Sequence, residues 1–407
     1  MDVNTYIKEN WIKSVRDGAR KGLPYPFTSP SCEQTSDVGF ENFFYWDTYF
    51  INIGLLSDGM VEQVKNNLQN LVYLLDKYGY IPNVATEGGD NRSQLPLFTL
   101  MCHAYFQYTG DEVFFRAIYP AMEKEYEFWM RERMAPCGLN RYGNNADDDT
   151  CINFYRAIKA ARLGGDMAQK DENARMRGSH LLSEAESGWD FTPRFGMRAE
   201  YFAPIDLNCI AYENECILSN FAPDGERALR YRRAAEDRKR NIEKICLHSG
   251  IYCDYDFVHN KHSEIASVAQ LFPYLCGVSN DGEGAIKILS RLEMVYGVST
   301  TEKTADCGKY QWSYPNVWPP LQYFAVTALD RVGRKDDAFR IAQKYLSVVE
   351  KSADDTDSLW EKYDCNCGCK ALVNEYAESK MLGWTAGTYR ALQHYVRTGK
   401  PIHDFVI

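Results

Sequence analysis

This sequence of 407 residues lacks long apolar runs and has no excess of basic over acidic residues. No stretch reaches the roughly 18 apolar residues of a membrane-spanning helix, and residues 1–18 are charged throughout, so we expect neither a membrane anchor nor a secretory signal. Lysine and arginine number 46 against 56 aspartates and glutamates, a net charge of −10. This balance argues against nucleic-acid and anionic-membrane partners and favours a small, neutral or weakly charged ligand.

A disulfide framework and a cofactor motif are also missing. The 13 cysteines are odd in number and scattered from Cys32 to Cys369, which favours reduced thiols and a cytoplasmic location. No phosphate-binding loop, dinucleotide fingerprint or HExxH motif occurs, so we expect no cofactor.

One dense cluster, Cys365-Asn366-Cys367-Gly368-Cys369, has two interpretations. Its single-residue gaps differ from the two-residue gap of a zinc knuckle, so we expect no metal there. The alternative is a metal site with Cys365, Cys367 and Cys369 as ligands, serving a cyclisation or prenyl-transfer reaction. Elemental analysis of the purified protein distinguishes the two interpretations, because it shows whether a metal is bound.

The dominant hydrophobic period is that of an α-helix. Within residues 60–80, Val64, Leu68 and Leu71 recur three or four positions apart, which predicts an amphipathic helix. Similar stripes cover residues 113–134, 227–247, 322–332, 336–349 and 382–396. Alternation typical of a strand is scarce, with residues 250–257 the best candidate. About a dozen helices would use the whole chain, so we predict an all-α protein with residues 1–407 as a single domain.

Five aromatic and polar segments interrupt the helical pattern, and we look for the chemistry there. They span residues 40–50, 81–97, 187–195, 310–322 and 361–384. Together they combine tryptophan and tyrosine with carboxylates, amides and arginine. This mixture suits a sugar, because aromatic planes stack on its apolar faces and the polar groups bind its hydroxyls. For any one segment alone, a packing role is the alternative.

The motifs in these segments have a specific order. They read Phe40…Tyr45-Trp46-Asp47, Ile81-Pro82-Asn83 with Asn91-Arg92-Ser93-Gln94, Ser187-Gly188-Trp189-Asp190, Gln311-Trp312…Pro315-Asn316…Trp318…Pro320, and Glu361-Lys362-Tyr363-Asp364. In this order they resemble the trehalase family of glycoside hydrolases. The resemblance extends from about residue 23 to residue 396.

The resemblance implies an (α/α)6 barrel whose connecting loops form a pocket, and the inverting hydrolysis of an α-linked glucoside. By similarity, Asp190 is the general acid and Glu361 the general base. The aromatic neighbours Trp189 and Phe191 would desolvate Asp190 and raise its pKa, as an acid requires. The positions that match sugar-binding positions of the family are Phe40, Trp46, Asp47, Asn83, Arg92, Gln94, Gly188, Trp312 and Glu375.

The sequence also departs from the family pattern around the pocket. Gly39 stands where the resemblance implies an arginine, and the segment after residue 142 lacks a second arginine and a glutamate. Ser313 replaces an aspartate, and residues 365–373 replace a glycine-rich lid. Each missing arginine removes charge-assisted hydrogen bonds worth roughly 1.5–3 kcal/mol each. We therefore expect a retained site for the cleaved sugar and an altered leaving-group side, with α-glucosidase activity.

Other interpretations stay open at this point. The acidic run Asp147-Asp148-Asp149 is either a solvated loop or a surface that faces a cationic or polyhydroxyl leaving group. The alternatives for the function are trehalase proper, a mannosylglycerate-hydrolase-like enzyme, and a non-catalytic sugar-binding protein on the same barrel. Retention of both Asp190 and Glu361 argues against a pure binding protein.

Overall fold

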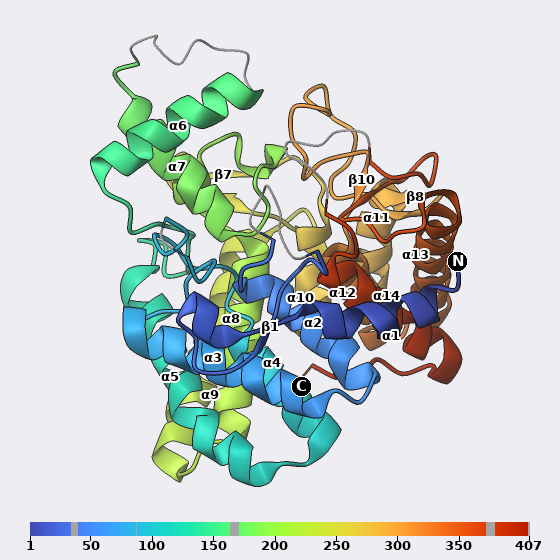
Figure 1. The fold of residues 1–407 in the computed structure, drawn as a ribbon. Helices are drawn as coiled ribbons and strands as arrows, with labels where there is room; N and C mark the ends of the chain where they lie inside the picture. Colours follow the sequence, from blue (N-terminus) through green and yellow to red (C-terminus); the bar gives the residue numbers. More distant parts are fainter. Residues whose placement is uncertain (34–39, 87, 163–170, 372–378, 406–407) are drawn as a thin grey trace.

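The computed structural model describes residues 1–33, 40–86, 88–162, 171–371 and 379–405, and most of these residues lie in α-helices (Figure 1). Six of the described helices form an inner ring: α2 (Tyr45–Ser57), α4 (Phe98–Thr109), α8 (Ile205–Asn220), α10 (Phe272–Leu275), α12 (Pro319–Arg331) and α14 (Gly383–Thr398). Consecutive members contact one another, and α14 contacts α2, so the ring closes.

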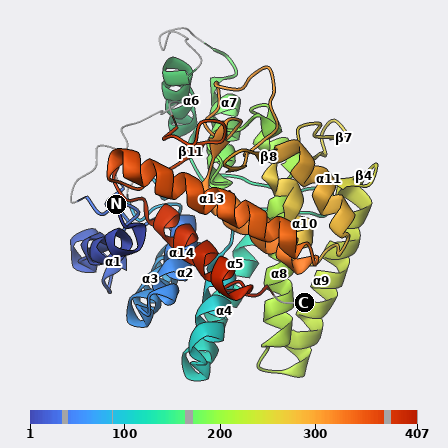
Figure 2. The same cartoon turned by 90° about the vertical axis from the view of Figure 1, so that its right-hand side faces the viewer.

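A second set of helices surrounds this ring: α1 (Val3–Ser14), α3 (Val61–Tyr78), α5 (Glu112–Glu132), α9 (Gly225–Cys246), α11 (Gly282–Leu292) and α13 (Lys335–Thr356). Outer and inner helices alternate along the chain and contact their neighbours, as α8 with α9 and α12 with α13. Figure 2 shows α13 beside α14 along one side of the barrel. This is the predicted (α/α)6 barrel.

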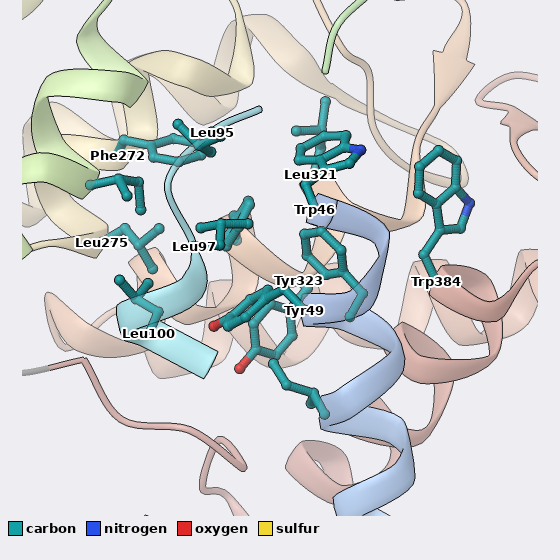
Figure 3. Close-up of a cluster of buried hydrophobic side chains, with 14 of the residues drawn as sticks. Trp46, Tyr49, Leu95, Leu97, Leu100, Phe272, Leu275, Leu321, Tyr323 and Trp384 are labelled. Atoms are coloured by element: carbon teal, nitrogen blue, oxygen red, sulfur yellow. The ribbon is translucent and has the colours of Figure 1, made fainter. Parts of the chain in front are cut away.

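Burial separates the two rings. The outer helix α3 buries Leu68 and Leu75 but exposes Asp76 and Lys77, the pattern of an amphipathic helix. By contrast, the inner helix α2 is buried at every position from Tyr45 to Leu56. Residues of α2, α4, α10, α12 and α14 gather in one hydrophobic cluster at the centre of the barrel (Figure 3). The barrel is therefore filled by side chains.

Two further helices, α6 (Asp148–Arg162) and α7 (Ala174–Glu186), pack on each other and extend from one end of the barrel (Figure 1). They have a small hydrophobic cluster of their own, which includes Tyr155, Leu181 and Phe191. Because Phe191 follows Asp190 directly, this pair of helices packs against the loop that carries one of the predicted catalytic residues.

The remaining regular structure is short and lies mainly in the connections. The strands are β1 (Val15–Arg16), β2 (Phe27–Thr28), β3 (Phe202–Ala203), β4 (Leu247–His248), β5 (Ile251–Tyr252), β6 (Tyr255–Asp256), β7 (Lys261–His262), β8 (Glu293–Met294), β9 (Gly297–Val298), β10 (Asn316–Val317) and β11 (Tyr363–Asp364). The 3-10 helices are η1 (Gly18–Lys21), η2 (Pro193–Phe195), η3 (Ala199–Tyr201) and η4 (Val268–Leu271). Pairing is antiparallel throughout, in the orders β1-β2, β3-β6-β7, β4-β5, β8-β9 and β10-β11.

The sequence stripes predict helices of both rings: the ranges 60–80, 113–134, 227–247 and 336–349 fall on the outer helices α3, α5, α9 and α13, and the ranges 322–332 and 382–396 fall on the inner helices α12 and α14. The strand candidate at residues 250–257 contains β5 and β6. The interpretation of residues 40–50, 310–322 and 361–384 as interruptions between helices was wrong in part, because α2 begins at Tyr45, α12 at Pro319 and α14 at Gly383. A helix buried on all sides has no polar face, so its periodicity is hidden.

Candidate active site

A cavity of about 180 Å³ lies where the loops between the inner helices meet. Its lining comprises Phe40, Phe44, Trp46, Asp47, Asn83, Arg92, Gln94, Gly188, Asp190, Trp312, Trp318, Glu361 and Trp384. The structure thus brings both predicted catalytic carboxyls together with eight of the nine predicted sugar-binding residues. The ninth, Glu375, and the departure at Gly39 lie outside the described residues.

The first turn of α2 supplies Trp46 and Asp47 to this pocket. The backbone N–H of Trp46 donates to Oε1 of Gln94 at 2.9 Å, which ties the helix start to the loop that carries Arg92. The pKa of Asp47 is raised to about 8, mainly by burial and in addition by the nearby charges of Glu361 and Asp190, while its own backbone N–H acts to lower it. Three carboxyl groups therefore share one electrostatic environment.

The guanidinium of Arg92 is held by amides on the loop after α3. With the amide of Asn83 turned so that its oxygen faces the guanidinium, Asn83 accepts from Nε and Nη2 of Arg92 at 3.2 and 2.8 Å. Nη1 of Arg92 donates to Oδ1 of Asn91 at 2.8 Å. Burial lowers the pKa of Arg92, while Asp190 and Glu186 act to raise it. An arginine held in this way presents an oriented set of donors to a ligand.

The loop after α7 carries Gly188 and Asp190. Gly188 has φ of +80°, a region that favours glycine, and its α-carbon lies against the ring of Trp46. Trp189 is fully buried, with the guanidinium of Arg194 at 4.3 Å from its ring. Arg194 in turn forms a buried ion pair with Asp206 at 2.8 Å. The motif residues next to Asp190 thus anchor the loop, and Asp190 itself faces the pocket.

Four tryptophans of the lining contact one another. Trp312 and Trp318 stack with ring centroids 3.7 Å apart and an angle of 5° between their planes. Trp384 meets Trp318 edge-on at 5.7 Å, and Trp46 lies 5.6 Å from Trp312. Such a surface of indole rings can stack on the apolar face of a pyranose ring.

Glu361 lies just before β11, which pairs with β10 in the register Asn316 opposite Asp364. Its carboxylate accepts from Nζ of Lys362 at 2.6 Å, and its backbone carbonyl accepts from Nε1 of Trp384 at 3.1 Å. Only 4% of Glu361 is exposed. The ammonium of Lys362 compensates the charge of Glu361 and fixes its orientation.

Behind the pocket, the carboxylate of Glu186 joins three segments. It forms a buried ion pair with Arg133 at 2.9 Å, and it accepts from the backbone N–H groups of Ser93 at 2.9 Å and Gly143 at 2.6 Å. Ser93 lies between Arg92 and Gln94, so Glu186 fixes the loop that presents both.

Sequence reasoning missed several residues of the site. Phe44, Trp318 and Trp384 line the pocket and were not predicted as sugar-binding residues. Glu186 and Gln311 support it from behind through hydrogen bonds. The available signal was proximity, because each of these residues lies within five positions of a predicted residue or in one of the five segments.

Two other predicted features lie elsewhere. Asp147 caps the start of α6, accepting from the backbone N–H of Thr150 at 2.7 Å, and all three residues of the acidic run are exposed. The run does not contribute to the described lining of the pocket, which argues against a contact with the leaving group. The acidic run is solvated, as one of the two interpretations expected, but it forms the start of α6 and not a loop.

The cysteine cluster also differs from expectation. Cys367 and Cys369 form a disulfide, whereas Cys365 is a buried free thiol. Two of the three candidate metal ligands are thus bonded to each other. Among the residues that the structure describes, no group of three or more histidine, cysteine, aspartate or glutamate side chains could hold a metal ion.

A closed ring of helix pairs with an acidic, tryptophan-lined pocket at the end of the ring defines a carbohydrate-processing enzyme of the (α/α)6-barrel class. A sequence model of the trehalase family matches residues 38–396. The chain therefore belongs to the trehalase family of glycoside hydrolases.

Individual relatives agree with this assignment. The chain is 31% identical to a periplasmic trehalase from Pseudomonas aeruginosa over 92% of its own length and 72% of the relative. It is 30% identical to a periplasmic trehalase from Escherichia coli over 90% of its length and 68% of the relative. Against a trehalase from Apis mellifera the identity is 29%, covering 90% of this chain and 62% of that one.

Two solved structures share the fold. The neutral trehalase Nth1 from Saccharomyces cerevisiae superimposes with a TM-score of 0.74 at 22% identity, covering 93% of this chain and 76% of the other. A GH63 mannosylglycerate hydrolase from Thermus thermophilus superimposes with a TM-score of 0.64 at 14% identity, covering 95% and 99%. These similarities confirm the predicted (α/α)6 barrel.

The comparisons correct the predicted location. Relatives from Pseudomonas aeruginosa and Escherichia coli are named periplasmic trehalases, which contradicts the expected cytoplasmic location. An odd, scattered set of cysteines can still include a local disulfide such as the one between Cys367 and Cys369, so the number and spacing of the cysteines do not determine the compartment. In the part of the chain that the structure describes, no helix is long and apolar enough to cross a membrane.

Proposed function

We propose that this protein hydrolyses an α-linked glucoside with inversion at the anomeric carbon, with Asp190 as the general acid and Glu361 as the general base. The observation that carries the proposal is that both carboxyl groups line one pocket together with the amides, arginine and indole rings that suit a hexose. Membership of the trehalase family supports the same reaction class.

In the proposed reaction, Asp190 gives its proton to the glycosidic oxygen as the bond to the anomeric carbon breaks. A water molecule attacks that carbon from the opposite face, and Glu361 takes a proton from the water. The products are β-glucose and the free leaving group. Lys362, 2.6 Å from the carboxylate of Glu361, holds the base in place for this step.

The lining residues support a single-sugar site. Arg92, Asn83 and Gln94 contribute polar groups to the lining, and Trp312 contributes an aromatic ring. Asp47 has a pKa of about 8 and is therefore largely protonated near neutral pH, when it can donate a hydrogen bond to a sugar hydroxyl. We propose that these residues bind the glucose unit that is released.

The departures at Gly39 and after residue 142 remove arginines and a glutamate from the leaving-group side by family resemblance. We therefore propose that the altered leaving-group side does not suit the second glucose unit of trehalose, so that trehalose is a poorer substrate than another α-glucoside. Trehalase proper is the second candidate, because the relatives from Pseudomonas aeruginosa, Escherichia coli and Apis mellifera carry that name.

Proton NMR of the reaction tests this function. Purified protein is mixed with trehalose, kojibiose, nigerose, maltose, glucosylglycerol or mannosylglycerate, and the first anomer of the released sugar is recorded. Early β-glucose from an α-glucoside other than trehalose is the expected result. Trehalose as the best substrate would favour the second candidate, and early α-glucose would contradict inversion.

A further inference from the structure

One buried glutamine connects the two predicted catalytic residues. Nε2 of Gln311 donates to the backbone carbonyl of Asp190 at 2.7 Å. Oε1 of the same side chain accepts from Nζ of Lys362 at 3.4 Å, and that ammonium donates to Oε2 of Glu361 at 2.6 Å. A carboxamide donates and accepts at once, so Gln311 links the loop of the acid to the ion pair of the base.

The glutamine itself is firmly placed. It is 1% exposed, and it is absent from the residues that line the described pocket. Its backbone carbonyl accepts from Nδ2 of Asn316 at 2.7 Å and from Nε1 of Trp318 at 3.0 Å. These bonds do not involve its side chain, so a substitution at position 311 leaves them available.

The neighbouring backbone strengthens the same connection. The N–H of Trp312 donates to the carbonyl of Phe191 at 3.1 Å, beside the contact between Gln311 and Asp190. The ammonium of Lys362 lies 4.7 Å from the ring centroid of Trp318. The segments that carry Asp190, Trp312 and Glu361 therefore meet around the Gln311 side chain, although they lie far apart in the sequence.

We propose that Gln311 is a positioning residue that sets the placement of Asp190 relative to Glu361. This inference rests on the proposed function, in which these two carboxyls are acid and base. An inverting reaction requires the two groups at a separation that admits one water molecule, and small errors in such placement reduce the rate of the chemical step. Because Gln311 does not line the pocket, its loss should change kcat far more than KM.

Two substitutions and a matched control test the role. Gln311→Met removes both side-chain hydrogen bonds at similar volume. Gln311→Glu retains the acceptor for Lys362 but loses the donor to Asp190, and it is nearly isosteric in case the first variant folds poorly. The control is Gln322→Met, because Gln322 is also buried and bonds the N–H and the carbonyl of Val298 at 2.7 and 2.8 Å, without contacting either carboxyl.

The readouts are kcat and KM for the best α-glucoside and for α-D-glucopyranosyl fluoride, whose fluoride leaving group needs little help from an acid. For Gln311→Met we expect at least a tenfold loss of kcat on the α-glucoside with KM within threefold of wild type, and a kcat near wild type in Gln322→Met. For Gln311→Glu, kcat on the α-glucoside should fall at least tenfold, and kcat on the fluoride should stay within threefold of wild type.

Each other outcome has a defined meaning. Wild-type activity in Gln311→Met, or an equal loss in Gln322→Met, would overturn the positioning role while leaving the proposed function intact. Equal losses of Gln311→Glu on the two substrates would overturn the link to Asp190. A wild-type protein that hydrolyses neither substrate would overturn the proposed function and, with it, this inference.

Discussion

Gly188 lies directly against the indole ring of Trp46. A Cβ added at position 188 would lie 2.9 Å from Cε2 of Trp46, closer than real Cβ contacts allow, and the φ of Gly188 is +80°. Both residues line the pocket. The absence of a side chain at position 188 therefore determines how closely the Asp190 loop approaches the first turn of α2.

This contact predicts the effect of Gly188→Ala. The left-handed backbone costs an alanine about 1–2 kcal/mol, and overpacking against Trp46 adds about 1–3 kcal/mol. The matched control is Gly196→Ala, because Gly196 has φ of +52° and no atom within 4 Å of an added Cβ. Urea unfolding should show the larger loss at position 188, and kcat/KM should fall only there. Equal losses at the two glycines would contradict the contact with Trp46.

The loss of kcat on removing each proposed catalytic group should depend on the leaving group of the substrate, and it should do so differently for Asp190 and Glu361. Asp190→Asn should lower kcat on an α-glucoside by about 10²–10⁴-fold, the usual contribution of general acid catalysis, and should lower it much less on α-D-glucopyranosyl fluoride. Glu361→Gln should lower kcat on both substrates, because each needs an activated water. Asp149→Asn, at an exposed position, serves as the control and should match wild type.

Asp47 should make stability depend on pH. Its pKa in the folded protein is about 8, against an ordinary value of 3.8, mainly because of burial. Between about pH 4 and pH 8 the folded state binds more protons at this site than the unfolded state does, so Asp47 lowers the free energy of unfolding as pH rises. In Asp47→Asn this contribution disappears. Melting temperatures measured from pH 4 to 8 should fall less steeply in the variant, and parallel curves would contradict the raised pKa.

The ion pair between Glu186 and Arg133 should be costly to break. Both side chains are at most 4% exposed, and removing one partner leaves an unpaired buried charge, a loss of about 3–5 kcal/mol. Glu186→Gln is the test, and Glu112→Gln at the exposed pair of Glu112 with Arg116 is the control, with an expected loss below about 1 kcal/mol. Urea unfolding compares the two. Similar losses would show that the buried pair contributes little.

The disulfide can be counted chemically. The structure has 11 free cysteines and one bond, between Cys367 and Cys369. Alkylation of the unfolded protein followed by mass spectrometry should therefore label 11 thiols without reductant and all 13 after reduction. The Cys367→Ser, Cys369→Ser double variant should label 11 in both conditions. Labelling of 13 thiols in the unreduced wild type would contradict the bond.

Much of the barrel was predictable because the outer helices have two different faces. The stripe of Val64, Leu68 and Leu71 marks α3 in the sequence, since water covers the other side of that helix. The inner helix α2 is buried on every side, so its residues have no alternation to read. The order of the family motifs supplied what periodicity could not.

The pocket lining was predictable, but its support was not. Trp46, Arg92 and Asp190 lie in motifs whose residue types suit a sugar. Gln311 opens one of these motifs and Glu186 lies just before another, but neither residue type reveals a supporting role, because that role depends on partners far away in the chain, such as Asp190 for Gln311 and Ser93 for Glu186. A side chain of ordinary type becomes informative only when the fold shows what it contacts.

The contact between α14 and α2 closes the barrel, and it has a consequence for biosynthesis. Among the inner helices, α2 (Tyr45–Ser57) leaves the ribosome first and α14 (Gly383–Thr398) last. Throughout translation of the intervening chain, the apolar face of α2 that α14 covers has no native partner. Such exposed surface invites aggregation, so the nascent chain should depend on chaperones until its last inner helix has been synthesised.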